Sequence, residues 1–230
     1  AHGLGRAHSL FEEGLCDHIR ANYEANPWVR RVLEVRTGPD GVDVRLELRR
    51  PVAGVAHTSH GRTLYTLVDR EGIRLPGASR RWPTDWMELP LVANARTAPP
   101  RPGCRWDEAA VLSGVSIACQ LDRWSDRLAD AEGRPVRFAT IDVTNFGGRE
   151  NRIAREIVLE TAEGARVLYG RSPLRPYAPG EASPEDKMHA LAQEVRKVTN
   201  LHLVDYIDVA VRGSAITRRR TAGLVETARR

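Results

Sequence analysis

Apolar and charged residues alternate strictly over residues 42–48, with valine or leucine at each even position and a charged residue between them. This period of two is the spacing of a strand that buries one face and exposes the other. The turn-forming run Pro39-Asp40-Gly41 precedes the strand, and a valine-rich stretch lies before the turn at residues 32–36. The pattern predicts a β-hairpin, and Pro51 either stops its second strand or marks a sheet edge.

A helix is expected just before this hairpin, over residues 9–25. Leu15, Ile19 and Tyr23 recur every four residues, which places them on one helical face. Pro27 ends the helix, because proline cannot continue the intrahelical hydrogen bonds. The helix is therefore expected to cover the apolar face of the hairpin, since an isolated two-stranded sheet is marginally stable in water.

The remainder of the chain has the pattern of short strands and two further helices. Ser183-Pro184-Glu185 has the residues of a helix start, and Asn200 can close that helix. Residues 76–106, rich in proline and arginine, are expected to form an ordered but irregular connection. Strands are expected at residues 65–68, 73–75, 136–143, 153–161, 167–169 and 203–212, and the earlier helix at residues 107–130.

These elements predict an α+β fold in two parts. A small helix-backed hairpin domain is expected over residues 1–57. A larger mixed domain, with a mainly antiparallel sheet and two helices, is expected over residues 58–217. The last segment, residues 218–230, is expected to be a basic flexible tail.

The net charge of +5 is concentrated in that tail. Five arginines and one glutamate lie within residues 218–230, so the other 217 residues carry a net charge near +1. So small an excess of positive charge, with only 6% aromatic residues, does not predict a nucleic-acid-binding surface. The sequence also contains no run of about 20 apolar residues of the kind that spans a membrane.

The three cysteines, Cys16, Cys104 and Cys119, are odd in number and include no CxxC pair. This spacing argues against a dense disulfide framework and against a cysteine-based zinc site. It leaves two alternatives open, which are three free thiols or a single bridge between Cys104 and Cys119.

No constellation of side chains in the sequence predicts catalysis. His57 and His60 come nearest to a metal-binding pair, but no third ligand lies at a useful spacing. Gly114-Val115-Ser116-Ile117-Ala118 has the spacing of a nucleophile elbow, yet it falls inside a helical pattern rather than at a strand–turn–helix corner. The expected strands also carry three carboxylates with no pairing and no nearby histidine: Asp142, Asp205 and Asp208. We therefore expect no enzyme activity, no cofactor and no bound metal.

Several short motifs follow one another in a fixed order along the chain. Pro27-Trp28-Val29-Arg30-Arg31-Val32 and the hairpin lead into Arg49-Arg50-Pro51-Val52-Ala53, which resembles the end of a POTRA domain in the bacterial cell-division family FtsQ/DivIB. Leu67-Val68-Asp69-Arg70-Glu71-Gly72, Leu89-Pro90-Leu91-Val92 and Val204-Asp205-Tyr206-Ile207-Asp208-Val209 resemble segments of the β domain of that family. The resemblance covers roughly residues 15–213. It departs from the family at Ala210, where arginine is usual, in the first POTRA strand and helix, which are not recognisable before residue 15, and in the membrane span of the family, which this sequence does not contain.

The resemblance implies a non-enzymatic scaffold at the periplasmic face of the cytoplasmic membrane, anchored by a single span expected upstream of Ala1. Its partners would be other division proteins, namely small single-span proteins of the FtsB and FtsL kind. The hairpin would be one docking surface, with Arg49, Arg50, Pro51 and Val52 as candidate contacts. Two alternatives are a POTRA-like chaperone for outer-membrane protein assembly or secretion, and an unrecognised envelope enzyme.

The expected final strand is the second candidate surface. Because no later strand is predicted, its edge would be open, and unpaired backbone groups there would pair with a strand from a partner. Tyr206 and Arg212 are expected to give selectivity, while Ile207, Val209 and Val211 pack inward. The alternative is a central strand that completes the core. The candidate contacts on this strand are Tyr206, Ile207, Asp208, Val209, Ala210, Val211 and Arg212.

Overall fold

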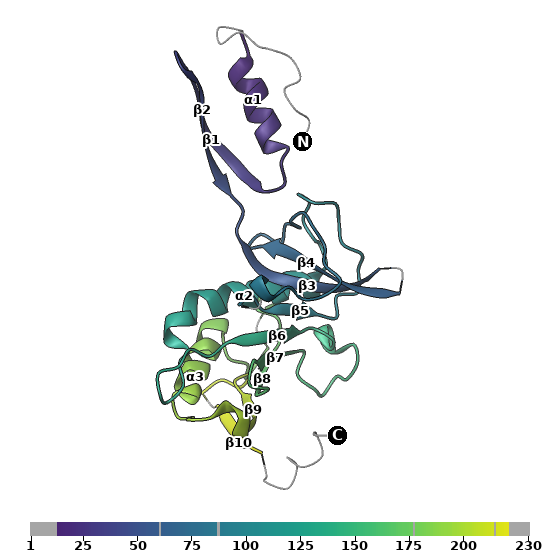
Figure 1. Cartoon of the computed structure of the whole chain (residues 1–230). Helices are drawn as coiled ribbons and strands as arrows, with labels where there is room; N and C mark the ends of the chain where they lie inside the picture. The colour runs from purple at the N-terminus through teal and green to yellow at the C-terminus, as the bar shows by residue number, and fades with distance from the viewer. Residues whose placement is uncertain (1–12, 60, 87, 177, 214, 221–230) are drawn as a thin grey trace.

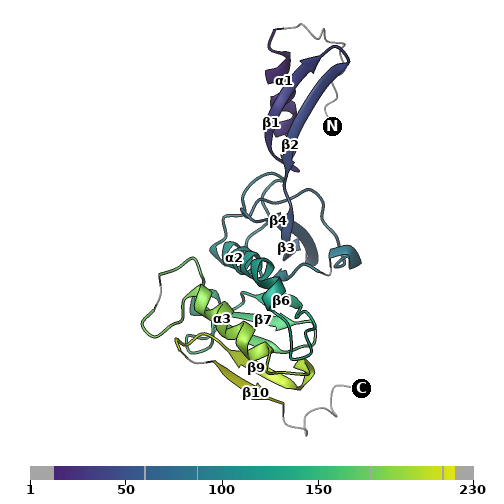
Figure 2. The ribbon, with the colours of Figure 1, turned by 90° about the vertical axis from the view of Figure 1, so that its left-hand side faces the viewer.

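The computed structural model describes residues 13–59, 61–86, 88–176, 178–213 and 215–220. A small lobe of one helix and one hairpin projects from a larger body built on a single sheet (Figures 1 and 2). The fold is α+β, as the sequence predicts. Parts of two predicted elements, residues 9–12 of the first helix and residues 221–230 of the tail, lie outside the described residues.

The small lobe contains α1 (Leu15–Glu24), β1 (Val29–Gly38) and β2 (Gly41–Leu48). The two strands pair antiparallel across the turn at residues 39–40, which confirms the predicted hairpin. Helix α1 packs on the hairpin through Leu15 and Ile19, which are buried together with Val29 and Val32 of β1. The apolar alternation of β2 therefore marks a real strand. Its last residue, Leu48, is nevertheless 56% exposed.

The larger body is an eight-stranded sheet in the order β10-β9-β8-β7-β6-β5-β3-β4. Its strands pair in both directions: β3 with β5, β5 with β6 and β8 with β9 are parallel, and the remaining neighbours are antiparallel. The strands are β3 (Pro51–Ser59), β4 (Arg62–Asp69), β5 (Leu91–Ala93), β6 (Phe138–Asp142), β7 (Ile157–Thr161), β8 (Arg166–Gly170), β9 (Val204–Asp208) and β10 (Ile216–Arg219).

Two helices, α2 (Ala109–Trp124) and α3 (Pro184–Val195), complete the core of this body. Helix α2 packs on β3, β5 and β6, and Gly114 lets it approach closely, since an added Cβ there would meet the side chain of Val92 at 2.7 Å. Helix α3 begins at the predicted N-cap, where Ser183 accepts a hydrogen bond from the backbone of Asp186. It ends at Val195, and Asn200 instead caps a short 3-10 helix over Leu201–Leu203.

Several predicted elements differ from those of the structure, mainly where a strand depends on pairing between distant segments. The strand predicted at residues 73–75 forms only isolated bridges, between Arg74 and Val68 and between Ile73 and Arg105. The predicted irregular connection contains β5, which lies in the interior of the sheet between β3 and β6. Strand β3 starts at Pro51 and belongs to the larger sheet, so it crosses the predicted domain boundary between residues 57 and 58. The strand predicted from residue 153 begins at Ile157, and Ile153 is 95% exposed. Arg218 and Arg219, predicted to belong to a flexible tail, form half of β10.

Candidate partner-binding surfaces

Strand β9, the predicted edge, is an interior strand. Its residues Tyr206, Ile207 and Asp208 pair with β8 on one side and with β10 on the other. Ile207 is fully buried, as predicted, and Asp208 forms a salt bridge of 2.7 Å with Arg155. Because both backbone edges of β9 are occupied, the prediction that a partner strand adds at residues 206–208 was wrong.

The next four residues are also engaged within the protein. Val209 is buried and Ala210 accepts a hydrogen bond from the backbone of Ala182. Arg212 donates its backbone N–H to Gly180, and Val211 pairs with Glu181 as an isolated bridge. Val211 is 42% exposed rather than packed inward, because β9 has already ended at Asp208. None of residues 209–212 presents the free edge that the sequence predicted.

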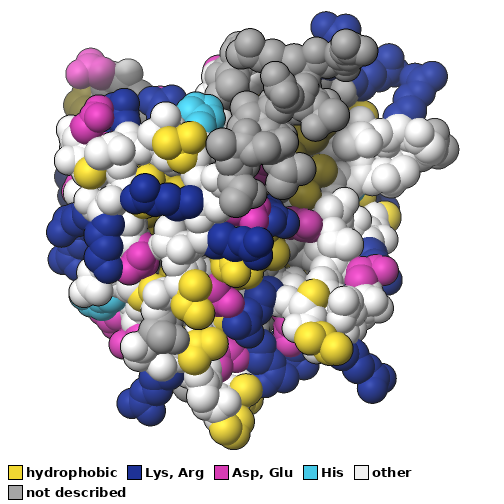
Figure 3. Space-filling model, turned by 90° about the horizontal axis from the view of Figure 1, so that it is seen from below, with side chains coloured by type: hydrophobic (Ala, Val, Ile, Leu, Met, Phe, Trp, Pro, Cys, Tyr) yellow, Lys and Arg dark blue, Asp and Glu magenta, His cyan; other side chains and the backbone are white. Residues whose placement is uncertain are grey.

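The open edge of the large sheet is β10. Within the described part of the chain it pairs only with β9, and Ile216, Arg218 and Arg219 are exposed. Thr217 points back to the body, where its hydroxyl donates to Glu194 of α3 over 2.7 Å. Seen from this end of the molecule, lysine and arginine side chains are spread over the surface with apolar side chains between them (Figure 3).

The opposite edge of the sheet, β4, is covered. Tyr65 exchanges two backbone hydrogen bonds with Ser79, each 2.9 Å long. Leu75 donates to Leu67 and Asp69 to Ile73, so the segment at residues 73–79 occupies much of the outer side of β4. A strand edge left unpaired is a template for another chain, and proteins commonly cover such edges. The contrast singles out β10 as the edge available to a partner.

The local sequence around β10 carries only a weak strand signal. Gly213 adopts a φ of +73°, which glycine tolerates and which reverses the chain after β9. Ile216 and Thr217 are β-branched residues that favour strands. The arginines that follow them suggested a solvated tail, because their pairing with β9 cannot be read from local composition.

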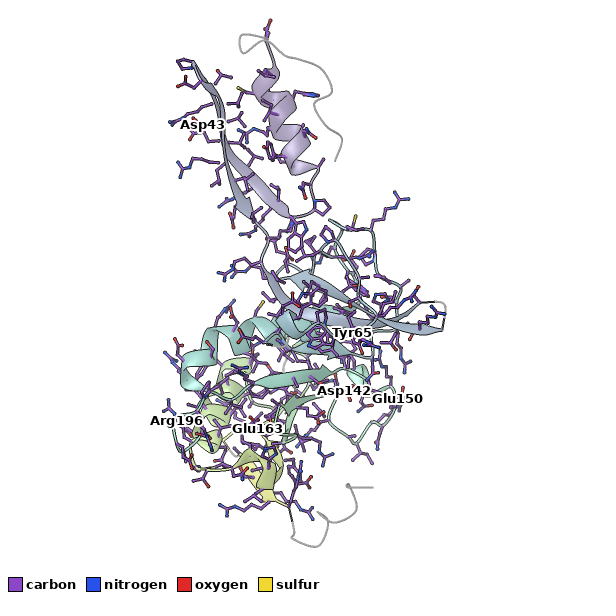
Figure 4. All side chains as sticks on the ribbon, viewed as in Figure 1. Asp43, Tyr65, Asp142, Glu150, Glu163 and Arg196 are labelled. Atoms are coloured by element: carbon purple, nitrogen blue, oxygen red, sulfur yellow. The ribbon has the colours of Figure 1, made fainter. Side chains whose placement is uncertain are left out.

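A network of five charged side chains lies at the base of the small lobe and ties it to the end of β4 and the turn that follows. Arg49, between β2 and β3, donates to Asp69 over 2.6 Å and to Glu71 over 2.9 Å. Arg30 of β1 bonds Glu71 over 2.6 Å and Glu47 over 2.6 Å. Hydrogen bonds from Arg49 and then from Arg30 hold the pKa of Glu71 below its usual value. This network attaches the lobe through its base, while Asp43 lies towards the far end of the hairpin (Figure 4).

The other predicted contacts at this position, Arg50, Pro51 and Val52, line a groove of about 520 Å³. The groove lies between the base of the hairpin, the carboxyl-terminal half of α2, and the loops that lead into β5 and β6. Arg50 is exposed, whereas Arg49 is 14% exposed and is committed to the ionic network. The structure therefore separates these adjacent arginines into one internal and one surface residue.

The residues considered for catalysis do not come together. His57 is buried and its Nε2 lies 3.0 Å from the hydroxyl of Thr66, while His60 lies outside the described residues. Burial lowers the pKa of His57, with Arg74 acting in the same direction. Ser116 lies within α2 and not at a strand–turn–helix corner.

The remaining observations concern metals, thiols and membranes. Among the described residues, no group of three or more histidine, cysteine or carboxylate side chains is placed to hold a metal ion. Cys16, Cys104 and Cys119 are all free, so the alternative of a bridge between Cys104 and Cys119 is not realised. No described helix has the length and apolar character needed to cross a membrane.

Comparison with known proteins does not assign the chain to a family. No protein-family model matches the sequence, and no curated protein matches it significantly.

Proposed function

We propose that this chain is the extracytoplasmic part of a non-enzymatic scaffold of the bacterial cell-division machinery, resembling the FtsQ/DivIB family. In this proposal the full-length protein is anchored in the cytoplasmic membrane by a single span. Its partners are small single-span division proteins, one of which adds a strand to the large sheet. The ordered motifs from Pro27 to Val209 support the family resemblance, and the geometry of the sheet supports the mode of binding.

The observation that carries the proposal is the difference between the two edges of the large sheet. Segment 73–79 covers β4, whereas β10 has no second neighbour among the described residues. In strand addition, backbone hydrogen bonds supply affinity and the outward side chains supply selectivity. On β10 these side chains are Ile216, Arg218 and Arg219, so the edge favours a partner strand that carries acidic residues.

The same charges disfavour self-association through β10. Two copies of this strand paired parallel and in register would place Arg218 and Arg219 of one copy opposite the same residues of the other, and like charges opposite one another destabilise a strand pair. Charged residues on an edge strand are a common protection against such pairing. An acidic partner strand removes this repulsion, which is the physical reason for assigning β10 to a partner of a different sequence.

Depletion of the full-length protein in its own bacterium tests the proposed role. We expect cells to elongate without septa, and an intact copy of the gene to restore division. A copy with Arg218→Glu and Arg219→Glu should fail to restore it although the protein accumulates normally. A matched copy with Arg62→Glu and Arg80→Glu, two exposed arginines away from β10, should restore division. Normal septation after depletion would contradict the proposal.

A further inference from the structure

The groove at the base of the hairpin lies at the amino ends of three neighbouring parallel strands. Pro51 and Val52 begin β3, Pro90 precedes β5, and Phe138 begins β6. The groove therefore lies against the ends of strands and not along the edge of the sheet. Addition of a further strand to the sheet is not the mode of binding that this groove favours, and its side chains are the groups considered for a ligand.

The floor of the groove contains apolar side chains from both parts of the molecule. Leu48 comes from the small lobe and is more than half exposed. The groove has a volume of about 520 Å³, and Val52 and Leu89, both partly exposed, add apolar surface beside Leu48. Leu121, Leu128 and Phe138 also line it, although each is largely buried.

The charged residues of the groove fall into two groups. Six arginines and four carboxylates line it. Arg30, Arg49 and Arg137 form salt bridges with neighbouring carboxylates of the protein, over distances of 2.6 to 3.5 Å. The other three arginines are exposed and form no salt bridge within the described part of the chain. Among the four carboxylates, only Asp122 is likewise exposed and without a salt bridge to a described residue. These three arginines are Arg50, Arg70 and Arg123.

Two of these unpaired arginines line the groove next to α2. Arg70 follows β4 and Arg123 lies in the last turn of α2, and both line the groove together with Cys119 and Leu121 of that helix. Burial raises the pKa of the half-buried Cys119 thiol, Arg70 and Arg123 lower it, and Asp122 and Asp69 raise it. The groove therefore combines apolar and positively charged lining residues.

We propose that this groove binds an acidic amphipathic helix of a protein partner. The apolar face of the helix would lie on the leucine-lined floor, and its carboxylates would pair with Arg50, Arg70 and Arg123. Docking of an amphipathic helix into an apolar groove uses side chains alone, which suits a site made of strand ends. The inference rests on the proposed scaffold function in treating the ligand as a protein, but its test uses purified protein and does not depend on cell division.

The probe is a fluorescein-labelled peptide of about 14 residues, four turns of helix, with leucines on one face and glutamates on the other. Fluorescence anisotropy should show saturable binding to the purified chain, weakening as salt is raised, because exposed charge pairs are screened. A peptide with lysines in place of the glutamates should not bind. A peptide of glutamate and alanine, which keeps the charge and loses the leucines, should bind much more weakly.

Charge reversal locates the binding site. The triple variant Arg50→Glu/Arg70→Glu/Arg123→Glu should weaken binding of the acidic peptide by about tenfold or more, since three rim ion pairs are replaced by repulsions. The matched control reverses three exposed arginines outside the groove, and it should bind as the unmodified protein does. That control is Arg62→Glu/Arg80→Glu/Arg81→Glu.

A thiol assay gives a second readout on a protein with the groove intact. With Cys16→Ser and Cys104→Ser, the remaining thiol is Cys119, and the acidic peptide should slow its reaction with a soluble disulfide reagent. Equal weakening by the two triple variants, or binding that leaves the reaction rate of Cys119 unchanged, would overturn the proposal. So would equal binding of the glutamate–alanine peptide. Binding of phosphatidylglycerol vesicles, but not of the peptide, through the same three arginines would assign the groove to a membrane surface instead.

Discussion

The guanidinium of Arg49 donates to the carboxylate of Asp69 over 2.6 Å, and the side chain of Asp69 is only 2% exposed. The other carboxylate oxygen of Asp69 accepts the backbone N–H groups of Glu71 and Ile73. One buried aspartate therefore fixes the turn after β4 and binds the segment that joins the two parts of the molecule. The position of the small lobe depends on this contact.

Removal of Arg49 should destabilise the protein substantially. Arg49→Ala leaves Asp69 charged, buried and without its cation, and loss of one partner of a buried pair costs about 3 kcal/mol. Urea unfolding should show this decrease in the free energy of unfolding. The control is Arg36→Ala, which removes a 72% exposed partner of Glu34 and should cost about 0.5 kcal/mol or less. Equal losses in the two variants would show that the Arg49–Asp69 contact does not stabilise the junction.

Acid should loosen the attachment of the small lobe. Hydrogen bonds from Arg49 and then from Arg30 lower the pKa of Glu71 below its ordinary value of 4.5. A carboxylate with a lowered folded-state pKa stabilises the fold above the unfolded-state value and loses that contribution as the pH falls through the folded-state value. The midpoint temperature of thermal unfolding, measured from pH 7 to pH 3, should therefore fall less steeply below pH 4.5 in Glu71→Gln than in the unmodified protein. An identical slope in the two proteins would contradict this linkage.

A second buried ion pair, Lys187 with Glu181, joins α3 to the segment that precedes it. The charged atoms are 2.7 Å apart, with the side chains 3% and 10% exposed, and burial lowers the pKa of Lys187 while Glu181 raises it. Lys187→Met should cost about 3 kcal/mol, because Glu181 is left buried and unpaired. Adding Glu181→Gln should restore most of that loss in the double variant. A double variant less stable than Lys187→Met would refute the assignment of the loss to an unpaired charge.

Gly54 of β3 is expected to be intolerant of any side chain. A Cβ at this position would overlap the ring of Trp82, which packs against Tyr65 and Trp86. Gly54→Ala should lower the free energy of unfolding by about 2 kcal/mol and change the tryptophan fluorescence, since overpacking forces neighbouring side chains to move. Gly38→Ala in the hairpin, where a Cβ meets little, should leave the fluorescence unchanged. Unchanged fluorescence in Gly54→Ala would contradict the contact.

Elements with a strong local pattern could be predicted from the sequence. The alternation in β2 and the helix start at Ser183-Pro184 each depend on only a few neighbouring residues, and the structure has both elements where the sequence predicts them. Strand β5 has only three residues between Pro90 and Asn94, too few to show alternation. It is a strand because β3 and β6 lie on either side of it, and that pairing is not visible in its own sequence.

The candidate surfaces could be predicted only in part for the same reason, since they depend on contacts between segments that are distant in sequence. The resemblance directed attention to the C-terminal region, but the free edge is one strand later than expected, because the pairing of β10 with β9 joins segments across the turn at Gly213. The groove could not be predicted, since Arg50, Arg70 and Arg123 are distant in sequence and meet only when the strand ends and α2 are packed together.

Photo-crosslinking in living cells shows whether a partner of the division machinery adds a strand to β10. The full-length protein would carry a photoreactive phenylalanine derivative at Ile216, at Ser79 on the covered edge, or at exposed Gln193 on α3. We predict that position 216 crosslinks to a small single-span division protein, identified by mass spectrometry, and that positions 79 and 193 do not. Crosslinking of that protein at position 79 or 193 with none at position 216 would contradict the account.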